Sequence, residues 1–166
     1  LTRNQIPFVL REKCESVYEH FLMKDMEDFF RAAEGQKDRA LFLRIFQKQR
    51  VCLGREALHS EQVDLQQVKD FYGSGFYESK QAVASVEALE RHLKQLAAMR
   101  PKLGIAYILH AMDYEGYLRR KAGGIKNILD EWKELLDWLM EDAGEFADWK
   151  SWKEYQDICE KDSLEG

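Results

Sequence analysis

The stretch ESKQAVASVEALERHLKQLAAMR, residues 78–100, decides the fold class of this chain. Its large apolar residues recur at spacings of three and four positions: Val83, Val86, Leu89, Leu93 and Leu96. This period places them on one face of an α-helix, and such a face packs against neighbouring helices. Pro101 then interrupts the pattern, because proline lacks the N–H group that a helix interior needs. The stretch predicts a long amphipathic helix within a helical protein.

Helical patterns cover most of the remaining chain, in the ranges 16–35, 38–47, 55–62, 64–73, 102–112, 113–124, 125–146 and 149–161. Their expected start and stop signals are the capping-box pairs Ser16/Glu19 and Asp64/Gln67, an N-cap at Asp38 and a stop at Gly35. The only strand-like piece is QIPFVLR, residues 5–11. We therefore expect an all-α fold, a compact bundle of about eight or nine helices with helix-turn-helix elements.

The composition is typical of a folded cytoplasmic domain. The chain has 166 residues, 45% of them hydrophobic, which is enough for one domain with a core. Three cysteines lie far apart in the sequence and indicate a reducing compartment. The N-terminus LTRNQIPF lacks the apolar core of a signal peptide, and no segment approaches the roughly 20 apolar residues that span a bilayer. We expect a cytoplasmic location and no membrane contact.

Charge is distributed unevenly along the chain, although the formal net charge is only −5. Residues 37–55 contain six basic residues and one acidic residue, while residues 127–166 contain thirteen acidic residues and four lysines. A basic patch of this kind can attract an anionic partner even on an acidic protein, although a solvated face is the simpler interpretation. The acidic part also contains all the tryptophans, which we interpret as core residues with a possible partner surface: Trp132, Trp138, Trp149 and Trp152.

The sequence contains no self-contained catalytic or metal site. Glu56 and His59 have the Glu-x-x-His spacing of di-iron helical bundles, but such a site needs this motif on two helices and two further glutamates. We interpret His59 and His92 as surface residues and His110 as a buried core histidine. Phosphate-binding and zinc-protease motifs are missing from the sequence. We assign no catalytic residue and no metal ligand, and rank an independent helical metalloenzyme last among the possible functions.

Three stretches carry a resemblance that spans nearly the entire chain. The first, residues 4–35, contains Ile-Pro-Phe at positions 6–8 and a Lys-Asp pair at positions 24–25. The second, DRALFLRIFQKQRVCLGREAL at residues 38–58, is similar to a helix end that leads through a Gly-Ile-Gly turn into a new helix. The third, residues 103–124, matches the pattern IxYIxxxxGYxxYL at Tyr107, Tyr114, Tyr117 and Leu118. In this order, the stretches resemble subdomain 2B of UvrD/Rep/PcrA-type superfamily 1 DNA helicases.

The resemblance implies an accessory segment of a larger ATP-dependent helicase. Residues 1–8 would end the preceding RecA-like domain segment, residues 9–162 would form the helical 2B subdomain, and residues 163–166 would link back to the motor. ATP and Mg²⁺ would bind between the motor domains of the parent protein, so this segment would hold no cofactor and catalyse nothing alone. The implied partners are duplex DNA, bound without sequence preference, and the motor domains of the parent chain. We expect the segment to be monomeric.

The turn QKQRVCLGREAL, residues 47–58, is the expected DNA contact. Backbone N–H groups at a helix start can approach a phosphate closely where the turn residues are small. By position, residues 52–54 occupy the Gly-Ile-Gly places, and a cysteine replaces the first glycine, so the close approach depends on the second one. The candidate DNA-binding residues are Lys48, Arg50, Cys52, Leu53, Gly54 and Arg55. The alternative is a protein-interaction module that docks on motor domains or on a partner protein.

Overall fold

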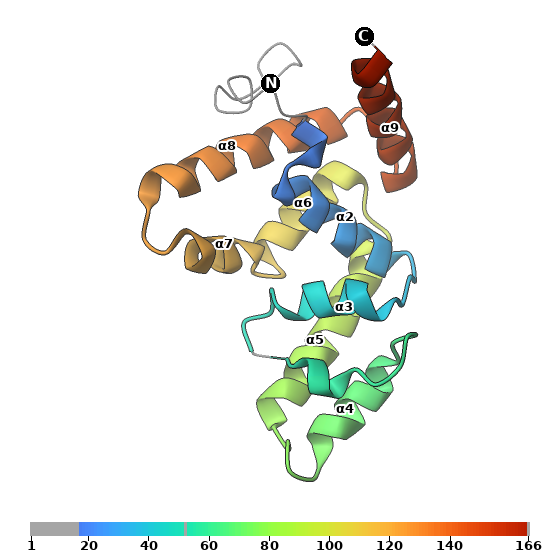
Figure 1. The fold of residues 1–166 in the computed structure, drawn as a ribbon, viewed down its shortest axis with the longest axis vertical. Helices are drawn as coiled ribbons and strands as arrows, with labels where there is room; N and C mark the ends of the chain where they lie inside the picture. The colour runs from blue at the N-terminus through green and yellow to red at the C-terminus, as the bar shows by residue number, and fades with distance from the viewer. Residues whose placement is uncertain (1–16, 52, 166) are drawn as a thin grey trace. The chain divides into compact units, whose positions relative to one another are not determined.

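Helices make up the regular secondary structure of the described residues. A computed structural model describes residues 17–51 and 53–165, with side chains as far as Lys161. Within these residues it contains eight α-helices, labelled α2 to α9 in Figure 1, two short 3₁₀ helices and one isolated β-bridge. The predicted all-α fold class is confirmed.

The described residues divide into two compact units. Residues 17–27, 99–107 and 118–165 form the first unit, and residues 28–98 and 108–117 form the second. The candidate DNA-binding turn lies in the second unit, and most of the acidic C-terminal part lies in the first.

Helices α4 (Leu65–Gly73) and α5 (Lys80–Leu96) pack against each other in the second unit (Figure 1). The predicted cap of α4 is confirmed, because an oxygen of Asp64 accepts a hydrogen bond from the N–H of Gln66 at 2.9 Å. Ser79 caps α5 in the same way through the N–H of Ala82, at 3.1 Å. The predicted apolar face of α5 is buried at four of its five positions, and Val83 is half-buried: Val86, Leu89, Leu93 and Leu96 are the buried residues.

His92 on α5 is less exposed than the charged residues around it in the sequence predict. Its predicted position is at the surface, and in the structure it is half-buried. Burial, and to a smaller extent the nearby positive charge of Arg91, lower the pKa of this imidazole.

Helix α2 (Phe21–Ala33) starts later than predicted and ends where predicted. The 3₁₀ helix η2 (Val17–Glu19) precedes it, and the side chain of His20 accepts a hydrogen bond from the N–H of Leu22 at 3.1 Å. The expected cap at Ser16 lies outside the described residues. At the other end, Gly35 has a φ of +107° and stops the helix, as its sequence position predicts.

Helix α3 (Arg39–Phe46) is attached to α2 by a charged pair within the second unit. The Arg44 guanidinium donates two hydrogen bonds to the Asp28 carboxylate, at 2.8 and 3.0 Å. The side chain of Asp28 is only 8% exposed, while that of Arg44 is 47% exposed. The predicted N-cap Asp38 has the expected position but makes no side-chain cap bond, so this part of the prediction is wrong.

Replacing Arg44 with methionine is expected to lower the free energy of unfolding by about 2 kcal/mol. The buried carboxylate of Asp28 would lose two charged hydrogen-bond donors, and the half-exposed position of Arg44 moderates the loss. Urea unfolding of the two proteins measures this difference. Arg55→Met is the matched control, because Arg55 is exposed, and we expect it to change stability by less than about 0.5 kcal/mol. Equal losses in both variants would contradict a stabilising role for the Arg44–Asp28 pair.

The helix predicted for residues 55–62 is reduced to the 3₁₀ helix η3 (Arg55–Ala57). Leu58 already has an extended conformation, with φ −110° and ψ 93°. Its carbonyl accepts a hydrogen bond from Nε of Arg39 at 2.9 Å, and the carbonyl of Glu61 accepts from the N–H of Arg39 at 3.0 Å. These bonds from α3 take the carbonyls that a continuing helix would use, and an isolated bridge between Asp38 and Gln62 completes the attachment.

Helices α6 (Pro101–His110) and α7 (Tyr114–Ala122) have the predicted order and stop signals. Gly123 and Gly124 follow α7 with positive φ angles of 60° and 88°. The predicted burial of His110 is wrong, because its side chain is 70% exposed and Nδ1 lies 3.5 Å from an oxygen of Glu115. Helical spacing explains the error: the buried residues Ile105, Ile108, Leu109 and Met112 share a face that His110 does not.

The tryptophans contribute to the core of the first unit, on α8 (Lys126–Ala143) and α9 (Trp149–Glu165). Trp138, Trp149 and Trp152 are buried, as predicted, and Trp132 is half-buried. Asp142 lies among them at 8% exposure. Its carboxylate accepts hydrogen bonds from the Tyr18 hydroxyl at 2.6 Å and from Nε1 of Trp152 at 3.0 Å. This buried polar centre has no counterpart in the sequence-based expectations.

The proposed domain ends fall mainly at the limits of the described chain. Residues 1–8, and the possible strand at residues 5–11, lie outside the described residues. Helix α9 includes residues 163–165, where a linker was expected. Within the described ranges, no helix combines the length and the apolar composition that a membrane crossing requires.

Candidate nucleic-acid interface

The candidate turn begins at the C-terminus of α3, where the last carbonyls of the helix accept hydrogen bonds from the residues that follow it. Backbone N–H groups of Gln47, Lys48 and Gln49 donate to carbonyls of α3 at 3.0–3.2 Å. The side chain of Lys48 donates to one further carbonyl, that of Arg44, and the side chain of Gln49 donates to the Ile45 carbonyl, both at 3.0 Å. A cation is favourable at this position, because carbonyl groups give a helix C-terminus a partial negative charge. The first part of the turn is thus a helix cap.

Lys48 does not add its charge to the exposed side of the turn, contrary to the sequence-based expectation. The residue is only 6% exposed. Its ammonium group donates to the Arg44 carbonyl and lies 5.5 Å from the ring centre of Tyr117. The four-carbon stem allows the side chain to fold back onto the protein, which sequence position alone does not reveal.

The glycine of the turn is already engaged by a side chain from α4. The N–H of Gly54 donates to the hydroxyl oxygen of Tyr72 at 2.8 Å. Its φ of −93° is open to any residue, so the position does not need glycine for backbone conformation. The helix that follows is η3, with three residues. The turn therefore leads into a 3₁₀ helix in place of the predicted α-helix, and the N–H group of its glycine is already bonded.

Glu56 lies directly against Gly54. A Cβ atom at Gly54 would collide with both carboxylate oxygens of Glu56, so this carboxylate covers the Cα of the glycine. Within the described residues, the Glu56 carboxylate forms no ion pair and accepts no hydrogen bond. The space that glycine leaves open for a close approach is thus filled by an acidic group of the same turn.

Arg50 and Arg55 are the exposed basic residues of the turn. Neither has an ion-pair partner among the described residues, whereas Arg39 and Arg44 are held by the Leu58 carbonyl and the Asp28 carboxylate. Leu53 is 5% exposed and belongs to the core. Cys52 lies outside the described residues. Of the six candidate residues, two arginines present charge to solvent.

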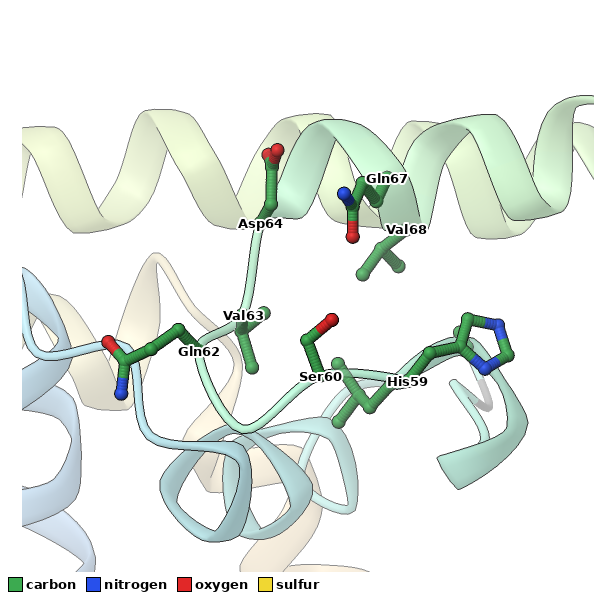
Figure 2. A pocket seen from close by; sticks show the side chains of 9 residues that line it. His59, Ser60, Gln62, Val63, Asp64, Gln67 and Val68 are labelled. Atoms are coloured by element: carbon green, nitrogen blue, oxygen red, sulfur yellow. The ribbon is translucent and has the colours of Figure 1, made fainter.

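A small pocket lies beside the turn, between residues 57–63 and the start of α4 (Figure 2). Figure 2 shows Ser60, Val63 and Val68 around it, with the ring of His59 and the amide of Gln62 directed away from one another. Its volume of about 10 Å³ corresponds to one water molecule and excludes an organic ligand.

His59 packs against an aromatic ring. It is exposed, as expected, and its ring centre lies 5.5 Å from that of Phe71. Across the described ranges, no group of three or more His, Cys, Asp or Glu side chains is arranged to hold a metal ion. The described residues therefore add no third metal ligand to Glu56 and His59.

Two residues of the site were missed from the sequence, for different reasons. Glu56 stands within the motif, and an acidic residue beside the glycine of a candidate phosphate contact is a signal in itself, because like charges repel. Tyr72 is 18 residues from Gly54 and no local pattern connects them.

Comparisons with protein-family models, with curated proteins and with solved structures find no match for the chain.

Proposed function

We propose that the chain is an accessory segment of an ATP-dependent DNA helicase, of the 2B type, that contacts duplex DNA without sequence preference. The observation that carries the proposal is the pair of exposed arginines, Arg50 and Arg55, on either side of one turn with no acidic partner among the described residues. Guanidinium groups bind phosphate oxygens through paired N–H donors. Such contacts position a protein on DNA and carry no sequence information.

The proposed contact is made by side chains. The N–H of Gly54 is bonded to Tyr72 and its Cα is covered by Glu56, so close approach of a phosphate to the backbone would require both to move. Two side-chain contacts support weak, salt-sensitive binding that assists a motor and does not replace it. ATP and Mg²⁺ are assigned to the motor domains of the parent protein, and this segment is proposed to modulate unwinding without catalysing it.

A salt titration of duplex binding tests the proposal. We expect two unrelated duplexes of roughly 20 base pairs to bind with equal affinity at low salt. The logarithm of the affinity should fall with the logarithm of salt concentration with a slope of about −2, because each phosphate contact contributes about −0.9. Fluorescence anisotropy of labelled duplex measures both quantities. A failure to bind at low salt, or a preference for one sequence, would count against it.

Replacing Glu56 with glutamine is expected to raise duplex affinity about threefold. The change removes a negative charge from the turn while keeping the shape of the side chain, so repulsion of the phosphates decreases. Glu78→Gln is the matched control, because Glu78 is exposed in the connection between α4 and α5 and the variant has the same net charge. Equal gains in the two variants would assign the effect to net charge and contradict a local role for Glu56.

The second candidate function is docking on the motor domains or on a partner protein. The buried positions of Trp149 and Trp152 remove these two side chains from any such surface. Exposed apolar residues of the first unit favour this candidate instead, and they are Leu103, Ile125 and Ile158, at 59%, 54% and 61% exposure.

A further inference from the structure

An open groove lies in the first unit, between the beginning of α6 and the end of α8. Its volume is about 390 Å³, which is within the range of sites that bind ligands. Leu103, Ala106, Met140 and Phe146 line it with apolar side chains. Leu103 is 59% exposed, so one wall of the groove presents apolar surface to solvent.

Two basic residues border this apolar surface: Lys102 in the first turn of α6 and Arg100, which directly precedes α6. They differ in their partners. Nζ of Lys102 lies 3.3 Å from an oxygen of Glu141 on α8, and the lysine stem passes over Gly144. A Cβ atom at Gly144 would come within 3.2 Å of Cδ of Lys102, so the small residue allows this crossing. Arg100 is exposed and has no acidic partner among the described residues. The groove therefore combines an apolar floor with one unpaired guanidinium.

We propose that this groove binds a short peptide segment of a partner protein that carries large apolar side chains next to a single carboxylate. The apolar side chains would cover Leu103, and the carboxylate would pair with Arg100, whose planar donor groups match a carboxylate. Glu145 is exposed and follows the groove residue Gly144 in the sequence, and its negative charge would disfavour a run of acidic residues, which is why one carboxylate is specified.

The size of the groove also selects the kind of partner. Stable complexes between folded proteins bury about 1,200–2,000 Å² in total, far more than a groove of this volume provides. A peptide segment needs less, because one or two buried side chains supply most of its binding energy. We expect a dissociation constant of roughly 0.1–1 mM. This site is separate from Arg50 and Arg55, which belong to the second unit.

Short peptides titrated into the whole isotope-labelled chain test the proposal by NMR. The probes are acetylated, amidated peptides with the central sequences Leu-Phe-Asp, Leu-Phe-Asn and Ser-Ser-Asp. We expect Leu-Phe-Asp to shift the amide signals of Ala106 and Gly144 and to bind about fivefold more tightly than Leu-Phe-Asn. Ser-Ser-Asp should leave both signals unchanged, because the apolar anchor is missing.

Variants then assign the two parts of the site. Leu103→Gln should weaken Leu-Phe-Asp binding about tenfold, and Arg100→Gln should make the Asp and Asn peptides bind equally. Ile158→Gln is the control, because Ile158 is exposed in the same unit and does not line the groove. Unchanged spectra of the free variants establish that they are folded. Equal binding of Asp and Asn peptides to the parent chain, or no shift at Ala106 and Gly144, would overturn the proposal.

Discussion

Replacing Asp142 with alanine is expected to destabilise the first unit by about 3 kcal/mol. The carboxylate accepts hydrogen bonds from two buried donors, the Tyr18 hydroxyl and the Trp152 indole N–H, at 2.6 and 3.0 Å. Tyr18 is 6% exposed and Trp152 is fully buried, so bulk solvent does not reach either donor in the folded protein. Each buried donor left unsatisfied costs about 1–3 kcal/mol. The loss would be a large part of the total stability of a domain of this size.

Urea unfolding followed by tryptophan fluorescence measures this loss, because Trp138 and Trp152 lie in the affected core. Asp142→Asn should lose less, since both donors bond the same carboxylate oxygen and an amide oxygen in its place still accepts from them. Asp137→Ala is the control, because Asp137 is exposed on the same helix and should change stability by less than about 0.5 kcal/mol. A loss below about 1 kcal/mol for Asp142→Ala would show that the two donors find other acceptors.

The Asp142 centre also shows what sequence patterns do not reveal. The apolar spacing on residues 78–100 correctly predicts the buried face of α5, because helical periodicity is a local property. Asp142 follows Glu141 in an acidic segment and has no local signal for burial. Its environment comes from Tyr18, 124 residues away, and from Trp152 on the next helix. A contact of this sequence separation depends on the tertiary fold alone.

The errors at the candidate site have the same origin. Residues 55–62 have a helical pattern, but hydrogen bonds from Arg39 to the carbonyls of Leu58 and Glu61 hold them in another conformation. Lys48 was expected to be exposed from its charge, yet the end of α3 offers carbonyl acceptors for its ammonium group. Arg50 and Arg55 have the expected exposure, and neither has an acidic partner in the described chain. Local pattern therefore predicts which residues bear the charge, and tertiary contacts determine which of them remain available.

Replacing both Arg50 and Arg55 with alanine is expected to lower duplex affinity by more than about tenfold at roughly 0.1 M salt. Each guanidinium that leaves a phosphate removes a counterion-release contribution, and the salt slope should fall from about −2 towards zero. Each single variant should lose about half of the slope. The arginines are exposed and without acidic partners among the described residues, so the substitutions should leave the fold intact.

The matched control is Arg91→Ala with Lys94→Ala, which removes two exposed charges from α5 in the same unit. A turn-specific contact predicts a much smaller loss in this control, whereas attraction by net charge alone predicts equal losses. Glu56→Gln adds a second discrimination. The threefold gain in duplex affinity from Glu56→Gln should vanish in the Arg50/Arg55 double variant. The Glu56 carboxylate lies in the same turn, so it repels a phosphate only when these arginines bind that phosphate there. Undiminished binding of the double variant would place the duplex contact elsewhere on the chain.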